Sequence, residues 1–140
     1  MSTRDSHPQP TLDERHASVL MDISNTMVRL YKEHFGRGPT TARTYWSGPD
    51  MLTAVLEHTL TPAERNLVAL NEHARLRDTR MFFQYATVRQ FCEPVEQITG
   101  RTVRAFISGI DTHVDGISIE TFILHPEGYT GASRTESAGA

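Results

Sequence analysis

The sequence has little cysteine and no long hydrophobic run. Its one cysteine, Cys92, has no second cysteine with which to form an internal disulfide or to hold zinc. No apolar stretch approaches the roughly 18 residues that a membrane-spanning helix needs, and the polar residues 1–10 lack the apolar segment of a signal peptide. We therefore expect a cytoplasmic protein that does not cross the bilayer by itself.

The chain also lacks an excess of positive charge. It has 14 Lys and Arg against 17 Asp and Glu, a net charge of −3 at pH 7, which argues against a protein devoted to coating nucleic acid. With 140 residues, 38% hydrophobic and 22% charged, it has the size and composition of one globular domain. Because residues 1–11 and 127–140 are small and polar, we expect disordered tails on either side of one domain at 12–126.

Hydrophobic periodicity divides this domain into a helix, two strands, a second helix and two more strands. Apolar residues three and four apart predict a first helix that ends at Gly36. The predicted strands are residues 42–47, 51–58, 102–110 and 117–125. We expect an α+β fold, a two-layer α/β sandwich in the order α-β-β-α-β-β, with both helices on one face of a four-stranded antiparallel sheet.

The second helix begins at the clearest local signal in the chain. Thr61 and Glu64 form a capping box around a proline at the first helical position. Its predicted apolar stripe is Leu67, Leu70, Ala74, Met81, Tyr85, Val88, Cys92 and Val95. Two residues interrupt the stripe, because Arg77 lies on it and Pro94 is expected to kink or split the helix.

The sheet face opposite the helices is a predicted interaction surface. We expect it to carry Thr53, Val55, Arg104, Phe106 and Phe122. If such aromatic and aliphatic side chains stay exposed, a second copy of the chain can cover them. We therefore expect a homodimer.

The loop after the first helix has the features of an anion-binding site. Two glycines allow a backbone to approach a ligand closely, and the guanidinium groups of Arg37 and Arg43 suit carboxylate, phosphate or bicarbonate. The candidate ligand-binding residues are Gly36, Arg37, Gly38, Pro39, Thr40, Arg43 and Arg77. The alternative is a structural loop that ends a helix and begins a strand, with its arginines paired to acidic neighbours. It is not a nucleotide-binding loop, because it lacks the Gly-Lys-Ser/Thr ending.

No catalytic residue set, metal site or cofactor is predicted. The seven histidines show no recognised metal-ligand spacing. Asp111, His113 and Asp115 alternate in one loop, but polar hairpin loops need such residues anyway. A small enzyme acting on an anionic substrate stays open as an alternative, with Asp111, His113 or Glu96 as acid–base groups.

A nucleic-acid-binding sheet is the other alternative. It would use Tyr45, Trp46, Arg104 and Phe106 as a stacking and charged surface. The negative net charge argues against it, so no strong nucleic-acid signal is present.

Four segments together resemble a known bacterial family. They are residues 28–39 (VRLYKEHFGRGP), 60–65 (LTPAER), 95–103 (VEQITGRTV) and 120–124 (ETFIL). They are similar to the MpsC-like family, formerly a domain of unknown function, named after the C component of a Na+-translocating membrane-potential-generating system. The resemblance implies an accessory protein linked to sodium-translocating or inorganic-carbon membrane machinery. Together with the loop residues above, it leads us to expect a small accessory or regulatory module that binds a small anion, or docks on a membrane complex for ions or inorganic carbon, through the Arg/Gly loop. It implies no catalytic residue.

Overall fold

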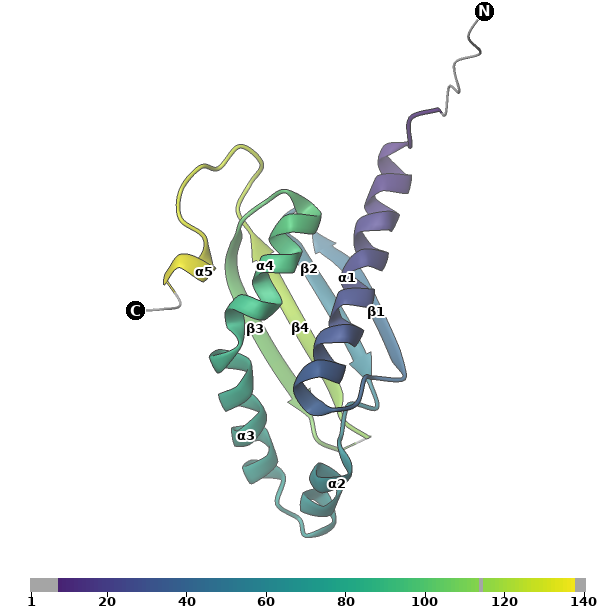
Figure 1. Ribbon diagram of the computed structural model, residues 1–140, viewed down its shortest axis with the longest axis vertical. Coiled ribbons are helices and arrows are strands. Elements are labelled where there is room, and N and C mark those ends of the chain that lie inside the picture. The colour runs from purple at the N-terminus through teal and green to yellow at the C-terminus, as the bar shows by residue number, and fades with distance from the viewer. Residues whose placement is uncertain (1–7, 114, 138–140) are drawn as a thin grey trace, which may run out of the picture.

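Four antiparallel strands form one sheet in the computed structural model, which describes residues 8–113 and 115–137. The strands are β1 (Thr41–Gly48), β2 (Met51–Glu57), β3 (Val103–Asp111) and β4 (Ile117–Leu124), in the order β1-β2-β4-β3 (Figure 1). The two hairpins therefore meet through β2 and β4. The predicted α+β class and order of elements are confirmed.

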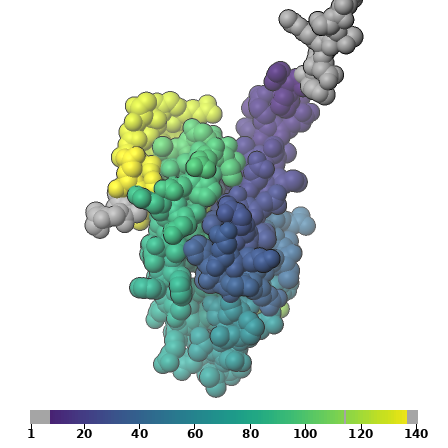
Figure 2. Space-filling view, viewed as in Figure 1, coloured from purple at the N-terminus to yellow at the C-terminus, as the bar shows by residue number. Residues whose placement is uncertain are grey.

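Helix α1 (Leu12–Phe35) lies across one face of this sheet. Thr11 and Glu14 begin it with a capping box, and Gly36 ends it in the left-handed conformation (φ 73°) that glycine adopts without a Cβ clash. Its buried residues are Ile23, Met27, Leu30 and Tyr31. The first turns of α1 stand clear of the body of the molecule (Figure 2).

The predicted second helix is in fact three helices. These are α2 (Pro62–Ala69), α3 (His73–Ala86) and α4 (Val88–Thr99). One break falls at Asn71, which has a left-handed φ of 59° that asparagine tolerates better than most residues. The other falls at Thr87 (φ −116°, ψ 20°). Of the kink or split predicted at Pro94, the split is wrong, because α4 continues through this proline. Phe91, Cys92 and Val95 anchor α4 in the core, and this packing outweighs one missing hydrogen bond. A kink at Pro94 stays a prediction.

The breaks change which side of the helix faces the core. A new helix, α3, begins at residue 73, so its side chains point in other directions than they would on one continuous helix. Its buried side chains are Leu76, Arg80 and Gln84. Met81 and Tyr85, predicted for the apolar stripe, are exposed. Arg77 is also exposed, so its predicted position on the buried stripe is wrong.

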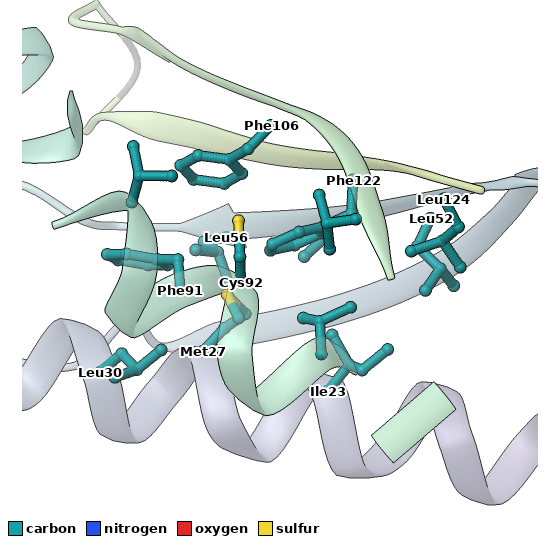
Figure 3. Close-up of a cluster of buried hydrophobic side chains, with 14 of the residues drawn as sticks. Ile23, Met27, Leu30, Leu52, Leu56, Phe91, Cys92, Phe106, Phe122 and Leu124 are labelled. Carbon is teal, nitrogen blue, oxygen red and sulfur yellow. The ribbon is translucent and has the colours of Figure 1, made fainter. Parts of the chain in front are cut away.

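The hydrophobic core lies between the sheet, α1 and α4 (Figure 3). Phe91 of α4 stacks on Phe106 of β3, and Phe106 packs on Phe122 of β4, with ring centroids 5.7 and 5.0 Å apart. Cys92 is part of this core, and burial raises the pKa of its thiol to about 12. The thiol is therefore protonated at neutral pH and serves packing.

The uncovered sheet face differs from the predicted one. A register shift between Val103 and Ala105 changes the alternation at the start of β3, and Phe106 and Phe122 point into the core instead of outward. Thr53 and Val55 do alternate with buried residues of β2 and lie on the outer face. The large apolar side chains exposed there are Tyr45, Ile107 and Ile119. Association of two copies through this face stays a prediction.

The end of the chain is partly ordered by contacts with the domain. Helix α5 (Arg134–Ser137) packs against α4 and β3. Ser133 and Thr135 are buried there, within the segment predicted as a tail. Residues 1–7 and 138–140 of the predicted tails lie outside the described residues.

Candidate functional site

Polar and titratable side chains gather at the end of the molecule where α1 ends and the β3–β4 turn lies. We call this region the polar end: the loop 36–40, the segment 58–64, the inward face of α3 and the turn residues 111–113 and 115–116. Thr59 joins two of its parts, because its amide and its hydroxyl both donate to the Gly116 carbonyl, at 3.0 and 2.6 Å. The loop joins through Thr40, whose amide donates to the Glu57 carbonyl.

The deepest feature of the polar end is a buried ion pair between α3 and α2. Arg80 is 1% exposed, and its Nε and Nη2 donate to the two carboxylate oxygens of Glu64 at 2.5 and 2.7 Å. Nη2 also donates to the Thr59 carbonyl at 2.5 Å. Burial opposes ionisation of Glu64, but the hydrogen bonds and charge of Arg80 outweigh it and lower the pKa of Glu64. The pair is therefore ionised and holds α2, α3 and segment 58–61 together.

The Arg80 guanidinium also lies on the aromatic side chains at the end of α1. Its central carbon is 4.0 Å from the ring centroid of Phe35 and 5.8 Å from that of Tyr31. Cation–π contacts of this kind strengthen when the cation is desolvated. Arg80 is thus the residue through which α1, α2 and α3 meet.

A second acid, Glu120 on the central strand β4, lies fully buried on the inner sheet face. Tyr31 of α1 donates its hydroxyl to Glu120 Oε1 at 2.6 Å. Burial raises the pKa of Glu120 to about 7, although hydrogen bonding to Ser108 and Tyr31 and the charge of Arg80 act in the opposite direction. Burial and the Glu120 charge raise the pKa of Tyr31 well above its usual value, so Tyr31 stays a donor.

Four buried polar atoms around Arg80 and Glu120 have no hydrogen-bond partner within bonding geometry among the described residues. They are Arg80 Nη1, Gln84 Nε2, Ser108 Oγ and Glu120 Oε2. The first two are donors on the inward face of α3, whereas Ser108 and Glu120 lie opposite each other on neighbouring strands of the sheet. Unsatisfied buried groups are uncommon in folded proteins, and each calls for an explanation.

The surface of the polar end carries a chain of three side chains. Thr40 Oγ1 lies 2.5 Å from His58 Nδ1, and His58 Nε2 lies 3.6 Å from Asp115 Oδ2. His58 and Asp115 both have left-handed φ angles, 57° and 58°, which cost energy outside glycine and collect at functional sites. All three side chains are exposed, so they form a surface feature and not a shielded catalytic group.

The other side of the β3–β4 turn holds a stacked histidine pair. The rings of His73 and His113 lie 4.2 Å apart and nearly parallel, and His73 Nδ1 is 2.7 Å from Thr112 Oγ1. The His113 amide donates to Asp111, and this bond, helped by the charge of nearby Arg77, lowers the pKa of Asp111. Arg77 therefore belongs to the Asp111 side of the turn.

The structure separates the residues predicted to bind an anion. Arg77 on α3 makes no hydrogen bond or ion pair with the loop among the described residues and acts through its charge on Asp111, whereas Thr40 of the loop contacts His58. Arg43 lies on the outer sheet face with Thr41, Tyr45, Val55 and Glu57. The residues predicted to bind an anion therefore lie in three places: Arg77 on α3, Arg43 on the outer sheet face, and the others together in the loop 36–40.

Within this loop, packing explains the glycines. Gly36 ends α1, and a Cβ on Gly38 would lie 3.3 Å from Val28 Cγ1, so Gly38 lets the loop press against α1. Pro39 is half-buried between Gly38 and Thr40. Arg37 is also half-buried and has no ion pair among the described residues, so the expected pairing with an acidic neighbour is not formed there.

The side chains named for the two alternatives do not assemble into one site. Glu96 accepts the Val103 amide at 2.7 Å at the start of β3, whereas Asp111 and His113 lie at its far end. Tyr45 lies on the outer sheet face, but Phe106 lies in the core, so the predicted nucleic-acid surface is not formed.

The exposed side of α3 carries the largest group of uncovered aromatic residues among the described ones. We call it the α3 face: Met81, Phe82, Phe83 and Tyr85, of which Phe82 and Phe83 are in ring contact. Phe82 is 71% exposed and Tyr85 63%. Asp78, Met81, Phe82 and Tyr85 line one shallow hollow on this side. The sequence pattern did not predict this exposed surface. Met81 and Tyr85 fit the buried apolar stripe of one continuous helix that begins at residue 62.

A cavity of about 450 Å³ lies at the opposite end of the molecule, lined in part by His16, Trp46 and Arg101. The guanidinium group of Arg101 already has partners within the chain there. It donates to the carbonyls of Pro49 and His125 and pairs with Asp50. Arg101 thus connects the β1–β2 turn to the segments before β3 and after β4.

Metal binding and membrane insertion find no geometric support in the part of the chain that the structure describes. No three His, Cys, Asp or Glu side chains there are placed to hold a metal ion. None of the helices described is both long and apolar enough to span a bilayer.

Comparison with known proteins places the chain in a family. Residues 16–126 match the family described as "Na+-translocating membrane potential-generating system (MpsC)". No curated protein and no solved structure matches the chain significantly. The match contains α1 from His16, the whole sheet, the polar end and the α3 face. Because it covers most of the 140 residues, the resemblance of the four segments is confirmed, and the chain belongs to the MpsC family.

Proposed function

We propose that this protein is a non-catalytic accessory subunit that docks on a membrane-embedded protein through the α3 face. Family membership links the chain, as a small accessory module, to a membrane-potential-generating system. The observation that carries the docking proposal is the exposure of Met81, Phe82, Phe83 and Tyr85 along α3. A module without a membrane-spanning helix among its described residues needs such a surface to join a membrane complex.

The size of the α3 face supports a protein contact. A fully buried aromatic side chain contributes roughly 150–250 Å², and the three aromatic rings here are 41–71% exposed. Together they present on the order of 350 Å² before Met81 is added. Contiguous apolar patches of this size mark interaction sites, and a standard interface buries about 800 Å² on each partner.

The charge within the α3 face favours a protein over bare lipid. Asp78 lines the same hollow as Phe82 and Tyr85, and it has no ion pair among the described residues. A carboxylate would be repelled by an anionic lipid surface, whereas an Arg or Lys of a partner can pair with it at the edge of an apolar contact. We therefore expect a partner that offers an apolar groove with a basic residue beside it.

The double substitution Phe82→Ser/Tyr85→Ser tests this docking. It should remove the chain from the membrane fraction of the cells that make it, with at least a tenfold drop in the bound share, because the two most exposed aromatic anchors are lost. A photo-reactive residue placed at position 82 should form a cross-link to an integral membrane protein.

The matched control is Ile107→Ser/Ile119→Ser, which removes two exposed apolar side chains from the uncovered sheet face. It should leave membrane association unchanged. Equal loss in both variants, or binding of the wild-type chain to protein-free vesicles, would contradict docking on a protein through the α3 face.

A second candidate function is anion binding at the loop 36–40, favoured by the half-buried and unpaired Arg37 described above. A thermal-shift panel of bicarbonate, phosphate, sulfate and nucleotides checks it. An anion at ~100 times its dissociation constant should stabilise the wild-type chain by about 2.7 kcal/mol, and Arg37→Ala should abolish that shift. The control is Arg43→Ala, on the outer sheet face. If no anion raises the midpoint, the loop is structural.

A further inference from the structure

The outer face of the sheet carries apolar side chains that docking through the α3 face does not use. Tyr45 on β1, Ile119 on β4 and Ile107 on β3 are 50, 42 and 58% exposed there. An antiparallel sheet can face water on one side, but the side chains on that side are then mostly polar. Because α1 and α4 pack on the other face, this apolar surface calls for a partner of its own.

The strand register arranges the outer face in rows that cross the sheet in the order β1, β2, β4, β3. One row is Tyr45, Thr53, Thr121 and Ile107, and the next is Arg43, Val55, Ile119 and Gly109. Asp111 of β3 lies one row further toward the β3–β4 turn. The β1 side of the face therefore presents Tyr45 and Arg43, and the β3 side presents Ile107, Gly109 and Asp111.

These two sides of the face differ in shape and in charge. The β3 side has a hollow lined in part by Gly109, Asp111 and Ile119, and a Cβ on Gly109 would meet nothing within 4 Å. The Asp111 side chain is exposed there, and only its Oδ1 accepts a hydrogen bond among the described residues. On the β1 side, Arg43 is exposed and has no ion pair among the described residues. A cation without a partner on one side thus matches an anion beside an open hollow on the other.

We propose that a second copy of this chain covers the outer sheet face, in a dimer whose two-fold axis lies in the contact plane close to the strand direction. Such an axis exchanges the two sides of the sheet, so β1 of each copy lies over β3 of the other. Tyr45 then packs on Ile107 of the second copy, and Arg43 lies over the Gly109 hollow beside Asp111. An axis across the strands would place every strand over itself, and Arg43 and Asp111 would stay apart. The face thus has the self-complementarity that a two-fold contact requires.

The outer face is large enough for this contact. Four strands about 4.8 Å apart and about eight residues long, at roughly 3.4 Å a residue, cover on the order of 500 Å² in projection. The relief of the side chains adds to this area, and small specific interfaces bury about 600 Å² on each partner. The inference is independent of the proposed function, because no residue of the α3 face takes part in this contact.

Sedimentation velocity of the purified full chain tests the dimer. At 100 µM the wild-type chain should sediment with twice the mass of one chain. Ile107→Ser/Ile119→Ser should raise the dissociation constant at least tenfold, because each dimer loses four apolar side chains from its contact. Phe82→Ser/Tyr85→Ser should leave the dimer unchanged. A wild-type chain that is monomeric at 100 µM, or a dimer that the isoleucine variant leaves intact, would overturn the proposal.

The same isoleucine variant separates this inference from the docking proposal, because it is expected to lose the dimer and to keep its membrane association. Dissociation of the dimer in this variant therefore says nothing against docking. Loss of membrane association in Phe82→Ser/Tyr85→Ser likewise says nothing against the dimer.

Cysteine cross-linking tests the direction of the axis. Tyr45→Cys and Ile107→Cys are made as separate chains and treated with a short bismaleimide, alone and mixed. The mixture should form a cross-link between the two variants, because positions 45 and 107 face each other. Each variant alone should form little, since its two cysteines are three strand spacings, about 14 Å, apart along the sheet.

The wild-type chain is the control for this cross-linking, because its one cysteine, Cys92, is buried and should not react. A cross-link that forms in Tyr45→Cys alone would indicate pairing through the β1 edge or an axis across the strands. That result, or a mixture without a cross-link, contradicts the proposed arrangement.

Discussion

Replacement of Arg80 by methionine should lower the free energy of unfolding by about 3 kcal/mol. Methionine keeps much of the length and apolar volume, but it leaves Glu64, whose side chain is only 14% exposed, without its cation. The Thr59 carbonyl loses a donor, and the ring of Phe35 loses the guanidinium that lies on it. Urea denaturation at pH 7 measures the difference.

The control for Arg80→Met is Arg77→Met on the exposed side of the same helix, which should change stability by less than about 0.5 kcal/mol. The double variant Arg80→Met/Glu64→Gln tests the cause. Because it leaves no unpaired charge and glutamine can still serve the capping box, it should recover part of the loss, with a coupling energy of about 1–3 kcal/mol. Additive losses would show that the guanidinium acts through packing alone.

The free energy of unfolding should fall by about 3 kcal/mol between pH 4.5 and pH 8 through Glu120 alone. The pKa of Glu120 is raised to about 7 in the folded protein, so the folded state holds this proton more tightly than the unfolded state. Its contribution is fully present below the unfolded pKa of about 4.3 and is lost as pH rises through 7. Chemical denaturation at half-unit pH steps measures it.

Glu120→Gln isolates this contribution from that of the histidines. The difference in stability between variant and wild type should move in favour of the variant as pH rises from 5 to 8, by about the same 3 kcal/mol. Glu64 does not interfere in this window, because its lowered pKa places its effect on stability below pH 4.5. A difference that is independent of pH would show that Glu120 does not titrate near neutrality in the fold.

These two residues show what the sequence could not reveal about the site. Arg80 and Glu64 are 16 positions apart and belong to a segment that the periodicity predicts as one helix. On a continuous helix Arg77 is the arginine on the apolar side. The left-handed Asn71 resets the phase and places Arg80 inside. The burial of Glu120 was not predicted either. Three isoleucines of β4 lie on the opposite face of that strand, and their alternation predicted that face to be the buried one.

The sequence alone determined the features that depend on neighbouring residues. The capping box at Thr61, the glycine that ends α1, the two hairpins and the α+β class all follow from local hydrogen bonding, backbone freedom and alternation, which act over a few positions. Four short segments likewise sufficed to place the chain in the MpsC family.

Only the tertiary structure decided which polar groups are buried and which apolar groups are left outside. The order β1-β2-β4-β3 puts Glu120 on a central strand, and the break at Asn71 lets α3 turn Arg80 inward and Phe82 outward. Both results depend on how elements far apart in the chain pack together. Local sequence patterns carry no information about that packing, because burial is a property of the whole assembly of helices and strands.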